Sequence, residues 1–396
     1  MFRLVPPSAT PLKVTDLIAA AFDERRTDLA AIVTQAAGCR HCYFLSSGRA
    51  AQYLILRAMS TMSEGDRHEV IIPAYTCFTV AASVVRAGLR VRPVDIDPST
   101  LDYRHEHLQQ QDWSKVLAIN ASNLFGISSH LDRLTSLARQ NDAYVIDDAA
   151  QMLGVETPFG PAGIRGDAGF FSLDRGKHLA VYSGGILITN NDELARQLDK
   201  IRADVASSSL FAGATVFIKL LAYSLLSRPQ LYRLPASLPM LGLGKTVYDP
   251  EFDVTGLSEF QQRLAGRLWP SLEQFNRHRS ETSGVIAEAL IADGRFEVPG
   301  FSGKPALPYL RLPVLAPDRD YRDRAIAALR KVGITATAMY PGVIADIRPL
   351  QPHLVGTDSD FSGARAVVDR LFTLPVHPLV TESDVGRMIA CLRGLA

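Results

Sequence analysis

Short apolar runs alternate with longer amphipathic stretches over residues 44–189. The runs 70–72, 91–94, 116–119, 143–146 and 185–189 have the length and composition of buried strands. Between them, residues 50–59, 79–87 and 131–139 repeat their apolar positions at helical spacing. Strands and helices that alternate in this way predict an α/β fold, in which helices cover both faces of a mainly parallel sheet.

The pattern changes from about residue 250 onward. Residues 258–290, 321–332 and 382–395 are helical in pattern, whereas 306–314 and 334–339 are strand-like. We therefore expect two domains: a large one over residues 1–245, and a smaller C-terminal α/β domain over residues 246–396.

The segment 205–248 has an unusual composition. It contains no Asp or Glu, but it does contain Lys219, Arg228, Arg233 and Lys245. Residues 210–226 are nearly all apolar, yet a membrane-spanning helix needs about 20 such residues. Two interpretations stay open: a helix buried in a dimer interface, which we favour, or a cationic helix lying on an anionic membrane surface.

Composition narrows the possible partners. The 396 residues include 42 Lys and Arg against 41 Asp and Glu, a net charge of +1, which gives no reason to expect a nucleic-acid partner. The N-terminus lacks an apolar export signal, so we expect a cytoplasmic protein. Cys39 and Cys42 have the spacing of metal ligands, but no second such pair follows them, so we expect reduced thiols and no metal site.

The clearest chemical signal is a carboxylate followed by a lone lysine. Asp148 lies two residues after the strand-like run 143–146, and Lys177 lies 29 positions after Asp148, on a loop. Ligands of parallel sheets bind beyond the carboxyl ends of strands, where residues 46–48 and 147–148 both fall. Pyridoxal 5′-phosphate (PLP) requires such a pair, because a lysine amine binds its aldehyde and a carboxylate keeps its pyridine nitrogen protonated.

Several further motifs occur in a familiar order. They are Ser47-Gly48-Arg49, Pro73-Ala74-Tyr75-Thr76, Asp147-Asp148-Ala149-Ala150-Gln151, Ser172 to Lys177 followed by Gly184-Gly185, and Leu374-Pro375-Val376-His377-Pro378. In this order the chain resembles the DegT/StrS family of PLP-dependent sugar aminotransferases. The resemblance runs from about residue 42 to 200 and resumes from 257 to the C-terminus. It implies the aspartate-aminotransferase-like fold (fold type I) and a homodimer.

The resemblance also implies roles for single residues. Ser47 and Gly48 open a helix whose N-terminus would hold the cofactor phosphate, together with Ser172. Asp148 would pair with the pyridine nitrogen, while its neighbour in the strand points to the opposite side. Gln151 would hydrogen-bond the cofactor's phenolic oxygen.

Three positions depart from the family pattern. Arg49 stands where the family has threonine, and it could bind the phosphate as a charged donor. That contact would replace the family's Asn-x-Arg segment, which is donated by the partner subunit and which residues 253–256 do not reproduce. Cys77 occupies the place of the aromatic residue that stacks on the cofactor ring, so we expect Phe78 or Tyr75 to supply the stack.

The reaction predicted by these residues is amino transfer. In dehydratase relatives the lysine is replaced by histidine, whereas here Lys177 is present and could also move a proton as a base. We expect an amino group to pass from an amino acid, with glutamate as the first candidate, to a keto-sugar carried on a nucleotide. The alternatives are a PLP enzyme of another reaction class acting on a more hydrophobic substrate, and a non-catalytic PLP-binding regulator.

Overall fold

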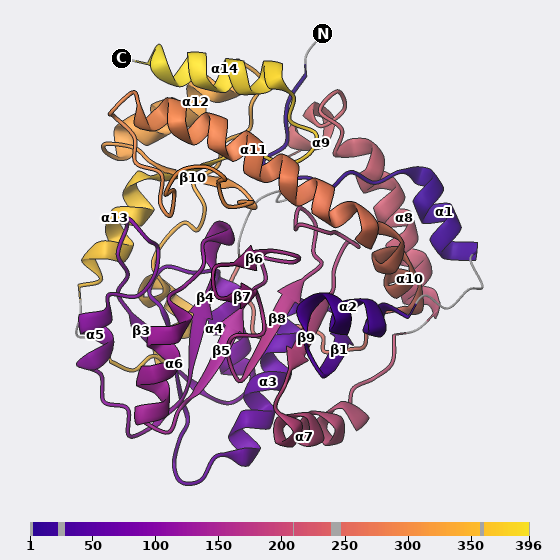
Figure 1. Cartoon of the computed structure of the whole chain (residues 1–396), viewed down its shortest axis with the longest axis vertical. Helices are drawn as coiled ribbons and strands as arrows, with labels where there is room; N and C mark the ends of the chain where they lie inside the picture. Colours follow the sequence, from indigo (N-terminus) through magenta and orange to yellow (C-terminus); the bar gives the residue numbers. More distant parts are fainter. Residues whose placement is uncertain (1–2, 23–27, 209, 239–246, 357–359, 396) are drawn as a thin grey trace.

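A seven-stranded sheet forms the centre of the chain (Figure 1). The computed structural model describes residues 3–22, 28–208, 210–238, 247–356 and 360–395. The strand order is β1-β9-β8-β5-β4-β2-β3. The strands are β1 (His41–Leu45), β2 (Glu69–Pro73), β3 (Arg90–Val94), β4 (Val116–Ser122), β5 (Tyr144–Asp148), β8 (Ala168–Ser172) and β9 (Gly185–Thr189). Only β9 runs antiparallel to its neighbours, so the predicted mainly parallel sheet is confirmed.

Helices cover both faces of this sheet (Figure 1). Alternate strand residues face opposite layers: Phe170 packs in the apolar cluster that contains α3, and Phe171 in the cluster on the other face. The helices around the sheet are α1 (Val14–Phe22), α2 (Leu29–Ala37), α3 (Gly48–Met62), α4 (Phe78–Arg86), α5 (His105–Gln109), α6 (Leu131–Gln140) and α7 (Asp192–Ala203). A two-stranded hairpin, β6 (Glu156–Thr157) and β7 (Gly160–Pro161), lies between β5 and β8 in the sequence.

The C-terminal part forms a second α/β layer beside the sheet (Figure 1). Its elements are α10 (Glu259–Leu268), α11 (Leu272–Ile291), β10 (Leu312–Leu315), α12 (Arg319–Lys331), α13 (Ser362–Arg370), β11 (Leu371–Leu374) and α14 (Glu382–Arg393). The N-terminal residues join this part, since Val5 bridges Ile334 and the Arg3 guanidinium lies 2.7 Å from the Asp384 carboxylate. The predicted division between residues 245 and 246 stays a prediction.

Three C-terminal expectations need correction. The predicted helix 258–290 is two helices separated by a 3₁₀ turn, Trp269–Ser271, because Pro270 cannot continue an α-helical hydrogen-bond ladder. The predicted strand 306–314 is shortened to Leu312–Leu315, since prolines at 305 and 308 remove donors from the segment before it. The segment 334–339 makes only isolated bridges, from Ile334 and from Thr337.

Two further helices occupy the acid-free segment 205–248. These are α8 (Leu210–Leu226) and α9 (Arg233–Ala236), while residues 209 and 239–246, Lys245 included, lie outside the described residues. One side of α8 packs against α1 and α10, with Leu220 fully buried. Among the residues described, no helix has the length and apolarity needed to cross a membrane.

Candidate active site

A cavity of about 310 Å³ opens at the carboxyl ends of the central strands. Eight of the nine predicted site residues line it, and the ninth, Phe78, does not. The eight are Ser47, Gly48, Arg49, Cys77, Asp148, Gln151, Ser172 and Lys177. They meet because β1, β4, β5 and β8 point in the same direction, so the loops after these strands share one edge of the sheet.

Lys177 lies on the loop that follows β8. Its backbone N–H donates to the Asp174 carbonyl at 3.1 Å, and its own carbonyl accepts from the Thr10 hydroxyl at 2.6 Å. Burial lowers the pKa of the Lys177 ammonium, because the surrounding protein solvates the charged form poorly. A larger share of neutral amine makes this side chain a better nucleophile and base than an exposed lysine.

Asp148 ends β5 with its side chain toward the cavity. One carboxylate oxygen accepts from the Ala150 N–H at 3.2 Å, and the other from the Asn120 amide at 3.3 Å. Burial raises the pKa of this carboxyl to about 6, although these two bonds and the nearby Lys177 favour the charged form. A buried amine and a buried carboxyl group therefore stand at one cavity.

The preceding residue, Asp147, faces away from the cavity, as period-two alternation along a strand requires. Its carboxylate accepts from the Gly163 N–H and from the Asn123 amide, each at 2.8 Å. The Arg165 guanidinium lies 3.7 Å away, and both of these side chains are almost fully buried. Asp147 therefore holds the segment before β8 in place.

The N-terminus of α3 forms another part of the cavity wall. The Ser47 hydroxyl accepts from the Ala50 N–H at 3.1 Å and caps the helix. A Cβ at Gly48 would stand only 3.3 Å from the Ser172 Cβ, so glycine lets these two loops approach each other. Free helix N–H groups, a serine hydroxyl and a guanidinium at one point match what a phosphate needs.

Arg49 supplies that guanidinium. It lines the cavity, lies 4.9 Å from the centre of the Phe252 ring, and is only loosely paired with the Asp249 carboxylate at 3.9 Å. A contact of that length leaves the guanidinium able to bind a phosphate, and that role stays a prediction.

The expected stacking aromatics are not at the cavity. Phe78 begins α4 with its side chain in the apolar core, and Tyr75 is fully buried with its hydroxyl bonded to the Met339 carbonyl. The aromatic residues that line the cavity are Phe170, Tyr182 and Tyr340. Sequence reasoning missed the two tyrosines, because Tyr340 comes from the C-terminal part and Tyr182 from a loop with positive φ.

Gln151 and His178 are fixed by hydrogen bonds. The Gln151 side chain accepts from the Phe125 N–H at 3.2 Å and donates to the Tyr340 hydroxyl at 3.4 Å. The two ring nitrogens of His178 lie 2.6 Å from the Asn276 amide oxygen and 2.9 Å from the Gln151 carbonyl oxygen, and the neutral ring donates to one of the two. Burial lowers the pKa of His178 to about 3. With no ring nitrogen free, His178 serves to position the loop of Lys177.

The acid-free segment reaches the cavity through Tyr182. Two cations lie close to the Tyr182 ring, the Arg175 guanidinium 4.8 Å and the Lys219 ammonium 5.5 Å from its centre. Lys219 belongs to α8, so this helix adds positive charge beside a residue of the cavity wall.

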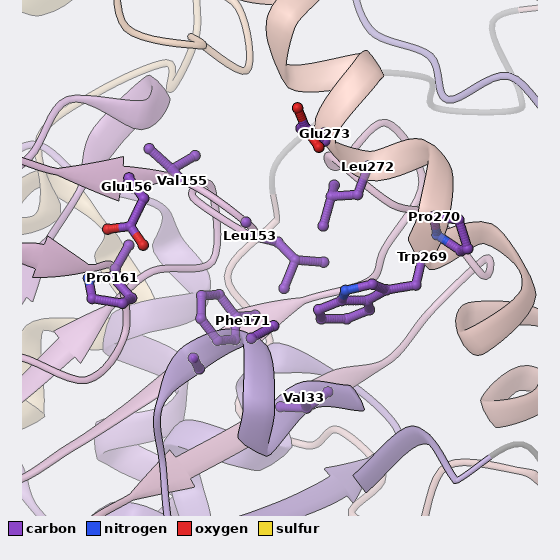
Figure 2. A pocket seen from close by; sticks show the side chains of 14 residues that line it. Val33, Leu153, Val155, Glu156, Pro161, Phe171, Trp269, Pro270, Leu272 and Glu273 are labelled. Atoms are coloured by element: carbon purple, nitrogen blue, oxygen red, sulfur yellow. The ribbon is translucent and has the colours of Figure 1, made fainter. Parts of the chain in front are cut away.

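A separate cavity of about 490 Å³ lies on the other face of β8 (Figure 2). Its walls include Phe171, Leu153 and Trp269, and its charged lining residues are Glu156 and Glu273. With two carboxylates and no lysine, this cavity does not match a PLP site. Within the described ranges no three His, Cys, Asp or Glu side chains cluster as metal ligands, and Cys39 and Cys42 are free.

Comparisons with known proteins place this geometry in a family. The sequence model of the DegT/DnrJ/EryC1/StrS aminotransferase family matches residues 23–211 and 257–393. The GDP-perosamine synthase of Caulobacter vibrioides is 32% identical over 355 residues, which are 90% of this chain and 85% of that protein. A GDP-4-keto-6-deoxy-D-mannose 3-dehydratase of Yersinia pseudotuberculosis is 33% identical over 42% of this chain and 43% of its own length.

The solved structure of DesI in the presence of its TDP-sugar product has the same fold. It superposes with a TM-score of 0.76 at 18% identity, over 99% of this chain and 93% of that one. The family match leaves out residues 212–256, which include most of α8 and all of α9. Because the match covers both parts of the chain on either side of that segment, this protein belongs to the DegT/DnrJ/EryC1/StrS aminotransferase family.

Proposed function

We propose that this enzyme transfers an amino group from an amino acid, with glutamate as the first candidate, to a keto-sugar linked to a nucleotide. The reaction would serve polysaccharide or glycoconjugate biosynthesis. The observation that carries the proposal is the shared cavity of Lys177 and Asp148, one buried amine and one buried carboxylate. The named relatives support the acceptor class, since GDP-perosamine synthase and DesI both carry nucleotide-sugar names or products.

The residues present fit PLP, the cofactor of aminotransferases of this family. Lys177 would hold its aldehyde end, Asp148 its pyridine nitrogen, and Ser172 with the start of α3 its phosphate. When bound, PLP supplies an aldehyde that carries the amino group and a ring that accepts electrons from the substrate carbon.

Each residue contributes to amino transfer in its own way. With PLP bound, Lys177 would take and return a proton as the neutral base that its lowered pKa favours. Asp148 offers a fixed negative charge that its two hydrogen bonds orient. Gln151 is held by Phe125 and Tyr340, so its amide cannot rotate away from the cavity.

The test is the first half of the reaction. Purified PLP-loaded protein is mixed with glutamate, and we expect the visible absorbance of bound PLP to give way to that of pyridoxamine phosphate while 2-oxoglutarate is released in equal amount. In the Asp147→Asn variant, altered on the far side of the same strand, the fraction of the protein that stays folded should still convert. No conversion with glutamate, glutamine, aspartate or alanine would favour another PLP reaction class or a non-catalytic PLP-binding regulator.

Two finer expectations are also proposals. We infer a homodimer, since the resemblance implies one, and we propose a cytoplasmic location. Light scattering behind size-exclusion chromatography measures the first, and cell fractionation the second.

A further inference from the structure

Two arginines in the interior of the protein have no carboxylate partner. Arg279 of α11 is fully buried, and its guanidinium donates to the carbonyls of Leu310, at 3.2 Å, and Ala9, at 3.5 Å. Arg311, the residue before β10, donates to side chains that carry no charge. In the part of the chain that the structure describes, no Asp or Glu pairs with either guanidinium. Arginine is almost never buried without a partner charge, so an anion from outside the described chain is expected here.

The same cluster contains hydrogen-bond donors that are not used. The Arg279 Nε–H and the Tyr223 hydroxyl of α8 are both buried, and neither has a hydrogen-bond partner among the residues that are described. Burial lowers the pKa of Arg279 to about 9, and the nearby charge of Arg311 acts in the same direction. Unused donors and unbalanced positive charge in one place are complementary to an anion.

Arg311 is the member of this cluster that a ligand can reach. It is partly exposed, whereas Leu310 and Leu312 on either side of it are buried. Its guanidinium lies 3.1 Å from the Met339 sulfur, and the next residue, Tyr340, lines the cavity of the candidate active site. The Arg311 guanidinium therefore stands at the border of that cavity.

The loop of Lys177 also adjoins Arg311. The Arg311 guanidinium donates to the Ser8 hydroxyl at 2.8 Å. Ser8 packs so closely against Gly176, the residue before Lys177, that a Cβ on that glycine would stand 2.2 Å from the Ser8 hydroxyl oxygen. Burial lowers the pKa of Lys177, and the charge of Arg311 adds to that effect. A compact anion at Arg311 would therefore lie next to the amine that is expected to hold PLP.

We propose that Arg311 binds a carboxylate of the amino donor. This inference rests on the proposed function and names the part of the donor that the enzyme recognises. A guanidinium binds a carboxylate through two parallel hydrogen bonds, and an amino acid brings a carboxylate close to its reacting amine. The cofactor phosphate does not need Arg311, because Ser172 and the start of α3 already offer it donors in the cavity.

The test follows the first half of the reaction in the full-length PLP-loaded enzyme. The dependence of its rate on glutamate concentration gives a Kd and a limiting rate. Arg311→Gln should raise the Kd for glutamate roughly 30-fold, which corresponds to about 2 kcal/mol, and change the limiting rate by no more than about threefold. Arg311→Lys keeps the charge without the planar fork and should raise the Kd about fivefold. The matched control is Arg277→Gln on α11, whose side chain is 63% exposed, and it should behave as wild type.

Alanine and glutarate extend the test. An equal loss with alanine as donor assigns the carboxylate next to the amine, and a loss confined to glutamate assigns the distal one. Glutarate has two carboxylates and no amine, so it should raise the thermal midpoint of wild type and have little effect on Arg311→Gln. Glutarate binding needs no amino transfer. Loss of transfer with glutarate binding intact therefore counts against the proposed reaction alone, and equal glutarate effects on wild type and Arg311→Gln count against Arg311 alone.

Four results would overturn the proposal. The first is an unchanged Kd for glutamate in Arg311→Gln or, if that variant does not fold, in Arg311→Lys. The second is weaker binding of UDP with glutarate binding intact, which would make Arg311 a nucleotide contact. The third is a change of oligomeric state in Arg311→Gln, which would assign the missing anion to a partner subunit. The fourth is a lower urea midpoint of Arg311→Gln without ligand, because removal of an unbalanced buried charge should leave the midpoint equal to or above that of wild type, whereas a structural arginine would be missed.

Discussion

Changing Asp148 to Asn should stabilise the cofactor-free protein while it disables the enzyme. The carboxylate is buried, and its pKa of about 6 lies above the ordinary value of 3.8. Because the folded chain binds this proton more tightly than the unfolded chain, the favourable contribution is complete below pH 3.8 and is lost as pH rises through 6. At neutral pH the folded protein therefore carries a charge that it would be more stable without.

The size of this effect follows from the same values. The gap between 3.8 and about 6 is roughly two pH units, and at about 1.4 kcal/mol per unit it amounts to about 3 kcal/mol at pH 8. Asparagine keeps the bond from the Ala150 N–H, but its own amide would face the Asn120 amide, which costs about 1 kcal/mol. We expect Asp148→Asn to raise the free energy of unfolding by about 2 kcal/mol at pH 8, and to give no gain at pH 4.

The measurement is urea unfolding of the cofactor-free protein at the two pH values. Asp147→Asn makes the matched comparison, because the same substitution one residue earlier leaves Arg165 buried without its carboxylate and should cost about 3 kcal/mol or more. In the loaded enzyme, Asp148→Asn should lower kcat by about 10²- to 10³-fold, since it removes a preorganised charge from the reacting ring.

Equal stability of Asp148→Asn and wild type at pH 8, or the same gain at both pH values, would show that burial does not destabilise the charged form of this carboxylate. If Asp148→Asn were less stable than wild type at pH 8, the Asp148 charge would stabilise the folded protein. The electrostatic argument that this carboxylate pairs with the pyridine nitrogen of PLP would then fail.

Three other changes test the cavity. Lys177→Ala should abolish the visible absorbance of lysine-bound PLP and all amino transfer, and retention of that band would show that another amine holds the cofactor. Gly48→Ala adds a Cβ 3.3 Å from the Ser172 Cβ, so the Kd for PLP should rise roughly tenfold while unfolding changes little; an unchanged Kd would remove this turn from the phosphate site. Arg49→Ala should raise that Kd about tenfold or more, and Arg49→Lys by less, as the loss of a charged hydrogen bond predicts; equal affinities would leave Arg49 without the proposed role.

The local pattern of apolar and polar residues was sufficient to predict the central sheet and its helices. Period-two and period-3.6 repeats report burial directly, so the runs that became β2, β4, β5 and β9 were found within a few residues. The presence of Asp148 and Lys177 at one site could also be predicted, because strand ends in a parallel sheet share one edge. The C-terminal strands were harder to predict, since prolines and isolated bridges interrupt the pattern there.

Tertiary structure alone decided which side chains complete the cavity and the outer surface. Tyr340 and Tyr182 line the cavity and the expected Phe78 does not, because α4 turns Phe78 into the core, which depends on packing partners distant in the sequence. One surface hollow is lined by cations from residues 3, 233, 330, 331 and 387, and no local pattern connects positions so far apart. A sequence determines the period of burial along one element, whereas the meeting of side chains from different elements is set by how those elements pack in three dimensions.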